Sequence, residues 1–583
     1  MVKLETIIEK LNMLFSIGDY ESAEKLIESA RKVPELYNDT VAIFDANLAM
    51  NTGNAPRMWN AIKRGLENNP KNYELYVMLG EYYLNTNPNQ AYLCFENALL
   101  YCDNESDYAQ IQGLIETLKN ENDVIVNNVS FIILSYNTLN YTKTCIESIR
   151  ENTLESSREI VIVDNASTDG SLEWLQEQKD IVLRANTENS GFPKGCNEGV
   201  EVAQKGNDIF LLNNDTFLPP NALFWLRMGL YENDKVGATG SITNYSSNLQ
   251  AVHISNPTTE NMLLFAQKTN LPMEYPYEEK LYLVGFALLI KRSVYDKVGD
   301  LDERFSPGNF EDNDYGLRVL QAGYKNILCH NSFIIHYGSK SFGKKSDSFK
   351  DILTINKEKF SKKWNLNPSY YFYPRPELIN SVTSDKQKDL NILDIGCGCG
   401  AICAHLKWQY PNASMYGVEI VSEVANIAKY IADVICGDIE TFDFPWKEDF
   451  FDYIIMGDVL EHLHEPSIVL NKLYKHLKSD GHIIISIPNI KHYSVMLPLI
   501  LNDEFHYSDS GILNTTHLKM YTRKELLRLI QDCGYTMETL SATQIGQPSK
   551  DIENVIETLT QLSISGDKAE YLAYQYVVKA KKK

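Results

Sequence analysis

The first ~120 residues lack the strand-like alternation of apolar and polar positions, but small residues recur in them at a constant phase. Ala23 and Ala91 lie 68 residues apart, which is two periods of 34, and Leu79-Gly80 with Tyr83 fits the first helix of a helix pair. Small residues let paired helices approach closely, and Pro34 and Pro70 mark the ends of such units. The pattern predicts an α-helical repeat domain.

The pattern changes at Val129, where short apolar runs separated by helical stretches begin. Residues 129–134, 160–163 and 209–212 each form such a run, and polar residues follow each of them. Runs of this length are typical of buried parallel strands. Ligands bind beyond the carboxyl ends of strands in doubly wound sheets, so the chemistry is expected at these polar ends.

Two further stretches complete the outline. Residues 281–290 form an apolar run of ten that is too short for the ~18 residues of a membrane span, and it predicts a buried strand. A second α/β series begins at Asn391. Residues 365–389 are polar and aromatic and contain three prolines, which predicts a linker.

The expected organisation is therefore multidomain. Residues 1–124 form the helical repeat domain, residues 127–364 a first α/β domain, and residues 390–583 a second, Rossmann-like α/β domain after the 365–389 linker. A chain of 583 residues has room for three or four domains.

Composition and charge narrow the function. The formal net charge of −22 argues against nucleic acid or anionic lipid as the main partner, because both are bound by basic surfaces. The first ten residues carry charges and no signal-peptide core, and no transmembrane segment is expected. Ten cysteines without framework spacing indicate free thiols in a reducing compartment, so we expect a cytoplasmic protein. Zinc at Cys397, Cys399 and Cys403 is disfavoured, since glycines separate them and no second Cys/His cluster exists.

The polar motifs of the first α/β segment come in a fixed order. They are Ser135-Tyr136-Asn137, Asp164 to Ser171, Asn189 to Asn197 with Gly191, Asn213-Asn214-Asp215, Glu311-Asp312-Asn313-Asp314 and His336. In this order, residues 128–345 resemble a family 2 glycosyltransferase with the GT-A fold. The N-terminal segment similarly resembles tetratricopeptide repeats, for which a docking surface for a polypeptide and a helical prop for the next domain are both open interpretations.

The resemblance implies a nucleotide-diphosphate sugar as donor. The implied sugar-nucleotide-binding residues are Ser135, Asn137, Asp164, Gly191, Asn197, Asn213, Asn214 and Asp215. Asp164 would contact the base, and a carboxylate can accept a hydrogen bond from the N3–H of uracil or thymine, which cytosine lacks. A UDP- or dTDP-sugar is therefore favoured. Read alone, Asp164 is equally suited to capping the turn after a strand.

A divalent cation, Mg²⁺ or Mn²⁺, is the implied metal, because the departing diphosphate develops charge that a hard cation neutralises. Asp215 is the main candidate ligand, Asn213 a weaker one because the family's triplet begins with Asp, and His336 a further ligand. Taken alone, His336 after an apolar run would more often be structural.

The resemblance makes Asp312 the catalytic base, which takes the proton of the acceptor hydroxyl as its oxygen attacks the anomeric carbon with inversion. Either Glu311 or Asp314 could orient the acceptor or pair with Arg318. An acidic helix N-terminus without catalytic function is the alternative. Lysines of the 340–345 loop could close over the diphosphate or simply be solvated.

The second α/β segment carries a glycine loop, Asp394-Ile-Gly396-Cys-Gly398-Cys-Gly400, after its first apolar strand. Glycine loops alone are weak evidence. Acidic residues that end the following strands strengthen it, and residues 390–540 look like a class I S-adenosylmethionine-dependent methyltransferase. The implied cofactor-binding residues are Asp394, Gly396, Gly398, Gly400, Glu419 at the ribose, Asp438 at the adenine, and Asp458.

Methyl transfer to a hydroxyl needs alignment and a base. His462 and His517 are the candidate bases, and each could instead be a structural histidine. Glu461 is expected to contact substrate or cofactor. No metal is required here, although a metal site at Asp458 and His462 stays open as an alternative.

The sequence thus predicts a bifunctional enzyme. It transfers a sugar, with rhamnose a candidate, to a glycan or glycoprotein acceptor such as flagellin, and it O-methylates a glycan sugar with S-adenosylmethionine. Such a fusion resembles bacterial enzymes that build surface polysaccharides or glycosylate flagellin. The alternative is a repeat-domain adaptor with an inactive glycosyltransferase segment and a methyltransferase acting on an unrelated substrate; Asn213 favours it, and Asp215, Asp312 and His336 oppose it.

Overall fold

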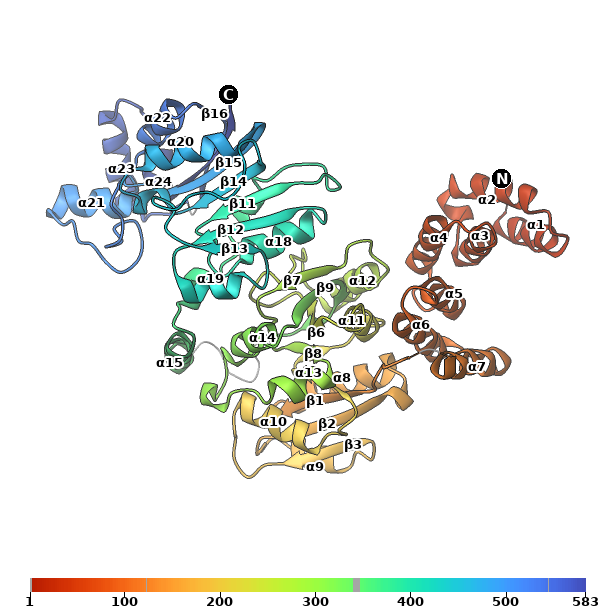
Figure 1. The fold of residues 1–583 in the computed structure, drawn as a ribbon. Helices are drawn as coiled ribbons and strands as arrows, with labels where there is room; N and C mark the ends of the chain where they lie inside the picture. Colours follow the sequence, from red (N-terminus) through yellow and green to blue (C-terminus); the bar gives the residue numbers. More distant parts are fainter. Residues whose placement is uncertain (1–2, 122, 339–346, 544) are drawn as a thin grey trace. The chain divides into compact units, whose positions relative to one another are not determined.

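A computed structural model describes residues 3–121, 123–338, 347–543 and 545–583. The chain divides into two compact units, Met1–Phe360 and Ser361–Lys583, and helix α15 (Asp347–Trp364) crosses the boundary between them. The first unit contains a helical region followed by a GT-A α/β domain, and the second is a Rossmann-like α/β domain (Figure 1). The predicted fold class is confirmed.

The helical region consists of consecutive helices joined by short turns. They are α1 (Leu4–Ser16), α2 (Tyr20–Arg31), α3 (Asp39–Asn51), α4 (Ala55–Asn68), α5 (Tyr73–Tyr83), α6 (Pro88–Tyr101) and α7 (Glu105–Glu121). Asparagine side chains begin four of these helices by accepting a backbone N–H of the first turn, namely Asn38, Asn54, Asn72 and Asn87.

Small residues do allow the helices to approach closely. Ala23 and Ala91 are fully buried. A Cβ atom added to Gly65 of α4 would lie 2.6 Å from a Leu75 methyl group of α5, and one added to Gly80 would overlap the ring of Phe95. At Gly65 and Gly80, the missing side chain therefore allows close contact with the next helix.

The sheet of the GT-A domain has eight strands in the order β3-β2-β1-β4-β8-β6-β9-β7. Its strands are β1 (Val129–Ser135), β2 (Arg158–Asp164), β3 (Ile181–Ala185), β4 (Asp208–Leu212), β6 (Val236–Ile242), β7 (Tyr277–Lys280), β8 (Ala287–Ile290) and β9 (Lys325–Phe333). A separate pair joins β5 (Thr216–Phe217) to β10 (Ile335–His336).

The polar ends of β1, β2 and β4 lie at one edge of this sheet. Both β2 and β4 pair with β1 in parallel, and Ser135 is in register with Asp164. The accompanying helices are α8 (Leu139–Asn152), α9 (Ser171–Gln176), α10 (Phe192–Val202), α11 (Ala222–Leu230), α12 (Thr259–Thr269), α13 (Arg292–Val298) and α14 (Glu311–Gln321).

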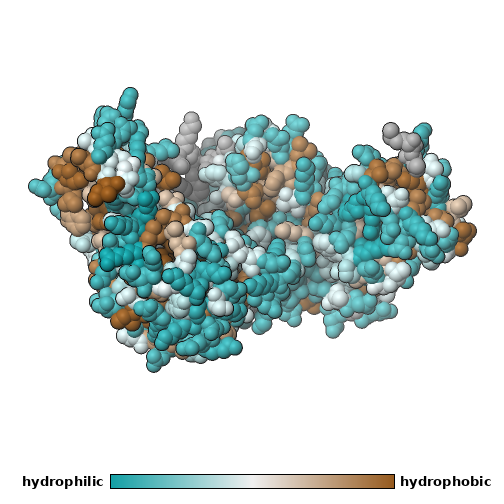
Figure 2. All heavy atoms as spheres, turned by 90° about the horizontal axis from the view of Figure 1, so that it is seen from above, coloured by the Kyte–Doolittle hydropathy of each residue, from teal (hydrophilic) through white to brown (hydrophobic). Residues whose placement is uncertain are grey.

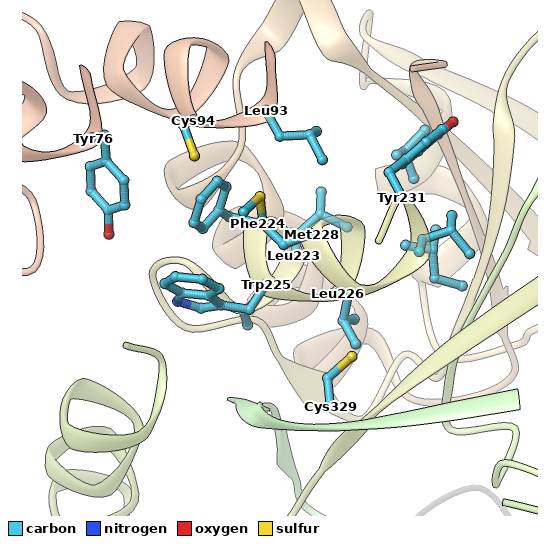
Figure 3. Packing of buried hydrophobic residues seen from close by; sticks show 14 of the residues in the cluster. Tyr76, Leu93, Cys94, Leu223, Phe224, Trp225, Leu226, Met228, Tyr231 and Cys329 are labelled. Atoms are coloured by element: carbon cyan, nitrogen blue, oxygen red, sulfur yellow. The ribbon is translucent and has the colours of Figure 1, made fainter. Parts of the chain in front are cut away.

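Helix α11 is buried between the helical region and the sheet of the first unit. Its apolar residues share one core with α5 and α6 on one side and with β9 on the other. Figure 3 shows Leu93 and Cys94 of α6 above α11 and Cys329 of β9 below it. Within this apolar contact, Arg227 of α11 forms a buried ion pair with Glu96 of α6. The helical region is therefore fixed to the GT-A domain.

The sheet of the second unit has seven strands in the order β13-β12-β11-β14-β15-β17-β16. They are β11 (Asn391–Ile395), β12 (Ser414–Glu419), β13 (Asp433–Cys436), β14 (Phe451–Gly457), β15 (Leu477–Pro488), β16 (Tyr535–Thr543) and β17 (Gln575–Lys582). The first five are parallel, and β17 pairs antiparallel with both β15 and β16. The strand order reverses between β12-β11 and β14, which is where a doubly wound sheet binds its ligand.

Helices of this unit cover both the sheet and the loops around it. They are α16 (Pro368–Tyr371), α17 (Pro376–Ile379), α18 (Ala401–Gln409), α19 (Ser422–Ala428), α20 (Pro466–His476), α21 (Tyr493–Asn502), α22 (Arg523–Asp532), α23 (Lys550–Leu562) and α24 (Ala569–Leu572). The segment 365–389, expected as a linker, thus contains α16 and α17.

The strand predicted for residues 281–290 is longer than the one in the structure. Only Ala287–Ile290 of the apolar run 281–290 is a strand, β8. Leu281 and Leu283 precede it without strand structure, yet both are buried. Leu281 and Leu283 are therefore apolar because they are buried, and not because they form a strand.

Figure 2 shows one face of the molecule, on which hydrophilic residues predominate and hydrophobic ones form separate groups. Among the described residues, no helix combines the length and hydropathy needed to cross a bilayer.

Candidate active sites

Asp164 lies at the edge of the first sheet where β1, β2 and β4 end. Its side chain is fully buried. Oδ2 accepts the backbone N–H of Ser167 at 2.9 Å, which caps the turn after β2, whereas Oδ1 has no partner in the described part of the chain. Asp164 can therefore cap the turn and bind a ligand at the same time, because its two oxygens accept hydrogen bonds independently.

Neighbouring polar residues hold this edge rigid. Asn137 adopts a left-handed conformation (φ 52°), and its Oδ1 accepts the N–H of Thr168 at 2.7 Å. Ser135 Oγ lies 3.3 Å from Thr142 Oγ1, and Asn214 donates to the same threonine oxygen at 2.9 Å. Asn214 is thus occupied in holding α8 against the end of β4.

Asp215 and His336, distant in sequence, are brought together by the pairing of β5 with β10. Asp215 Oδ1 lies 3.2 Å from His336 Nε2, and both side chains are almost fully buried. His336 Nδ1 lies 2.9 Å from the carbonyl oxygen of Tyr245. Because a carbonyl only accepts, Nδ1 carries a proton, and in the neutral ring the Nε2 lone pair faces the carboxylate.

Such a pair repels rather than bonds unless a cation or a proton lies between the two lone pairs. The ring of His336 is held in this orientation by stacking on Phe286 at a centroid distance of 5.0 Å. A histidine whose second nitrogen donates to a carbonyl is the arrangement that metal sites use to orient their ligands. Asp215 and His336 could therefore hold a divalent ion.

Two other predicted nucleotide residues shape the backbone. Gly191 has φ 81°, and a Cβ there would lie 2.9 Å from Pro307 Cα, so no side chain fits. Asn197 Nδ2 donates to the carbonyl of Leu301 at 2.9 Å, and its Oδ1 accepts the Leu301 N–H at 2.9 Å. The Asn197 amide ties α10 to the segment before α14. For Asn213, the backbone N–H bonds Phe286 O at 2.8 Å.

The acidic start of α14 separates into three environments. Asp312 Oδ2 accepts the N–H of Gly285 at 3.1 Å, and its Oδ1 accepts that of Asn313. Burial raises the pKa of Glu311 well above its ordinary value, with Asp312 nearby adding to the shift, and burial likewise raises the pKa of Asp312. Asp314 pairs with Arg318 at 2.9 Å, one of the pairings expected.

A carboxylate with a raised pKa is a stronger base, so Asp312 is suited to take a proton from a hydroxyl group. The lysines expected to close over the diphosphate, Lys340, Lys344 and Lys345, lie outside the described residues.

The glycine loop of the second unit needs its glycines for conformation as well as space. Gly396, Gly398 and Gly400 have φ of 70°, 55° and 88°. Glu419 at the end of β12 accepts the Gly398 N–H at 3.0 Å with one oxygen, so the loop is tied to that strand. Burial, with a contribution from Glu419, raises the pKa of Asp394 to about 8.

Two further predicted cofactor residues differ in their partners. Asp438 Oδ1 accepts the N–H of Glu440 at 2.9 Å, which shapes the turn after β13. Asp458 receives Arg375 Nη1 at 2.9 Å on Oδ2 and Ser486 Oγ at 2.7 Å on Oδ1. Asp458 therefore fixes the loop after β14.

One cavity of about 340 Å³ joins the glycine loop to the candidate bases. Its lining includes Asp394, Gly398, Asp458, His462 and His517. The two histidine rings meet edge to face at a centroid distance of 4.8 Å. Burial lowers the pKa of His462, so the imidazole is neutral near pH 7.

Sequence reasoning missed several residues that line this cavity. Tyr370, Tyr371 and Arg375 come from the segment expected as a linker, and Gln575 comes from β17. In segment 365–389, the run of aromatic residues beside prolines was the available signal, since exposed linkers rarely carry so many tyrosines.

The model described as glycosyl transferase family 2 matches residues 130–299. The glycosyltransferase GlyG of Streptococcus pneumoniae is 30% identical to the chain over 222 residues, an alignment that covers 36% of this chain and 71% of that relative. The chain belongs to the family 2 glycosyltransferases. Its first α/β domain is of the inverting GT-A type.

The model described as methyltransferase domain matches residues 369–540. A malonyl-(acyl-carrier protein) O-methyltransferase of Bacillus cytotoxicus is 32% identical over 106 residues, which cover 17% of this chain and 36% of that relative. The second unit is thus a class I S-adenosylmethionine-dependent methyltransferase domain, and S-adenosylmethionine is its implied cofactor.

An uncharacterized protein of Sinorhizobium fredii is 28% identical over 232 residues, or 37% of this chain and 25% of that protein. The chain spans between a quarter and about two fifths of the length of the first curated relatives that it matches.

Proposed function

We propose that the chain is a bifunctional enzyme that transfers a sugar from a UDP- or dTDP-sugar to a glycan or glycoprotein acceptor and O-methylates a glycan sugar with S-adenosylmethionine. Rhamnose is a candidate sugar and flagellin a candidate protein acceptor. The observation that carries the first half is the juxtaposition of Asp215 and His336 at 3.2 Å, because a histidine oriented by a carbonyl and facing a carboxylate is an arrangement that can hold a cation.

In the first reaction, Asp215 and His336 would hold Mg²⁺ or Mn²⁺, and the ion would supply positive charge to neutralise the departing diphosphate. Asp164 Oδ1 accepts the N3–H of the pyrimidine, and its lack of another partner supports this role. Asp312 takes the proton of the acceptor hydroxyl, whose oxygen attacks the anomeric carbon as the diphosphate leaves from the opposite face. Glu311 beside it orients the acceptor.

In the second reaction, the glycine loop and Glu419 bind S-adenosylmethionine. Glu419 supports this assignment because one oxygen already fixes the loop at Gly398 and its position at the end of β12 suits the ribose hydroxyls. Asp438 is assigned to the adenine amino group. Both O-methyltransferases and an N-methyltransferase are among the relatives, and the O-methyltransferases are the more frequent among them, which favours oxygen as the methyl acceptor.

The helical region combines both expected roles in this proposal. Helix α6 is a prop, since it shares a core and a buried ion pair with α11. Helices α1 to α3 have a separate core and form the part proposed to dock a polypeptide acceptor. The adaptor alternative keeps one argument, the Asn at position 213, but it leaves the facing Asp215 and His336 without a purpose.

Purified full chain should release nucleotide diphosphate from a panel of UDP- and dTDP-sugars only with Mg²⁺ or Mn²⁺ present. Asp215→Ala and Asp312→Ala should each abolish sugar transfer while the chain keeps its fold by circular dichroism. If no donor is consumed under any condition, and neither variant changes the glycans of cells, the adaptor alternative is correct.

A further inference from the structure

A second group of metal-ligand type lies in the cavity of the methyltransferase domain. One carboxylate oxygen of Glu461 and one nitrogen each of His462 and His517 all lie within 4.8 Å of one another. Glu461 and His462 are consecutive in a short 3-10 helix, Leu460–His462, whereas His517 comes from the loop between α21 and α22. Two elements far apart in sequence thus converge on one point.

Backbone hydrogen bonds hold these two elements together. The N–H groups of Leu518 and Lys519 both donate to the carbonyl oxygen of Glu461, at 2.7 and 3.0 Å. These backbone hydrogen bonds fix His517 beside Glu461. A site that must hold a small ion benefits from such a preset geometry.

Both histidines are oriented in the same way. His462 Nδ1 lies 3.1 Å from the carbonyl oxygen of Thr516, and His517 Nδ1 lies 2.8 Å from that of Ile512. Because carbonyls only accept, each Nδ1 carries a proton, and in the neutral ring each Nε2 keeps a lone pair that can bind a metal. Metal-binding histidines are typically oriented by this second hydrogen bond.

Glu461 supplies the independent observation. Its side chain is 1% exposed, and neither carboxylate oxygen bonds to another described residue. A buried carboxylate without a partner is strongly unfavourable, and Arg375, which lines the same cavity, is paired with Asp458 and Glu377. A bound cation would relieve this cost.

We propose that Glu461, His462 and His517 bind one divalent transition-metal ion, Zn²⁺ or Mn²⁺. Two imidazoles and one carboxylate suit either ion, and three protein ligands leave positions open toward the cavity. The open positions take oxygen atoms of the methyl acceptor. The histidines then act as ligands, not as the catalytic base expected from the sequence.

This role for the ion rests on the proposed O-methylation. An acceptor hydroxyl on the ion loses its proton to water more readily. Its oxygen then forms a bond to the methyl carbon of S-adenosylmethionine as the carbon–sulfur bond breaks. The electron pair of that bond stays on sulfur, so the sulfonium becomes the neutral thioether of S-adenosylhomocysteine.

The test is the metal content of the full chain in an Asp215→Ala background, which removes the other proposed metal site. After dialysis against Zn²⁺ or Mn²⁺ and removal of free ion, elemental analysis by inductively coupled plasma mass spectrometry should find one ion per chain. Glu461→Gln and His517→Ala should weaken binding at least about 10-fold, the lower range for disturbing a metal site. His464→Ala, an exposed histidine nearby that pairs with Glu440, should bind like the background.

Binding of S-adenosylmethionine identifies chains that are folded. A folded background chain that binds no ion, or a folded Glu461→Gln variant that binds as tightly as the background, would overturn the metal site. Methyl transfer at full rate after removal of the ion with a chelator would overturn its role in catalysis. An ion bound without methyl transfer to any sugar would retain the site and reject the proposed function.

Discussion

The buried ion pair between Arg227 and Glu96 offers the sharpest test of how the helical region and the GT-A domain form one unit. Arg227 is 3% and Glu96 7% exposed. Besides Glu96, Arg227 donates to the carbonyl of Asn127 at 2.8 Å, and its Nε has no partner among the described residues. Glu96→Gln keeps the size of the side chain but leaves the guanidinium charge buried without a counter-charge.

Breaking a buried pair on one side typically costs about 3–5 kcal/mol. At about 2.1 cal/mol/K of unfolding entropy per residue, a unit of 360 residues has about 0.76 kcal/mol/K. The Tm of the first unit should therefore fall by about 4–7 °C. Calorimetry of the full chain measures it, in the transition that S-adenosylmethionine does not raise, because a ligand stabilises only the unit that binds it.

Two further variants make this reasoning refutable. Glu21→Gln removes an exposed pair with Lys25 in the same region and should leave Tm unchanged. Glu96→Leu with Arg227→Met should recover most of the loss, because an apolar pair of similar volume avoids the desolvation of both charges. A shift below about 1 °C for Glu96→Gln, or an equal shift for Glu21→Gln, would refute the assigned burial.

Other predictions address chemistry, packing and pH. Asp312→Asn should slow sugar transfer by about 10²–10⁴-fold, the usual contribution of a general base, with unchanged affinity for UDP by titration calorimetry; an unimpaired rate would exclude Asp312 as the base. Gly80→Ala should destabilise the first unit by about 1–3 kcal/mol in thermal unfolding because its methyl group would overlap the Phe95 ring. Gly113→Ala in α7, with no atom within 4 Å of the added Cβ, should stabilise it by up to about 1 kcal/mol, and equal effects of the two would contradict the packing. Asp394, whose pKa burial raises to about 8, keeps a proton in the folded state that the unfolded chain loses near pH 4, so stability of the second unit should fall as pH rises between about 4 and about 8. Asp394→Asn should flatten this fall in Tm measured across the range, and an unchanged slope would assign the effect to another group.

The strands at both sheet centres were predictable from the sequence because parallel strands buried on both faces are continuous apolar runs. Residues 129–134 correspond to β1 and residues 209–212 to β4 almost without change. The same rule fails at residues 281–290, since a buried loop is as apolar as a buried strand and periodicity cannot separate them. The packing of α6 on α11 could not be predicted, because the Glu96 and Arg227 that form it are 131 positions apart.

The candidate sites, like the fold, were predictable from the sequence only in part. Residues at strand ends, such as Asp164, were expected near one another because parallel strands end at a common edge. The contact of Asp215 with His336 depends on the β5–β10 pair, which has two residues in each strand and no sequence signal of its own. Likewise, the carbonyl partners that orient His462 and His517 are backbone atoms, which no residue pattern identifies.

The central claim is that one chain carries two transferases acting on glycan. It is tested most directly by mass spectrometry of glycans from cells that carry Asp312→Ala or Asp394→Ala in place of the natural chain. We predict a glycan shortened by a sugar in the first and a glycan lighter by the mass of one methylation in the second. Glycans identical to those of the unmodified cells in both variants would contradict the account.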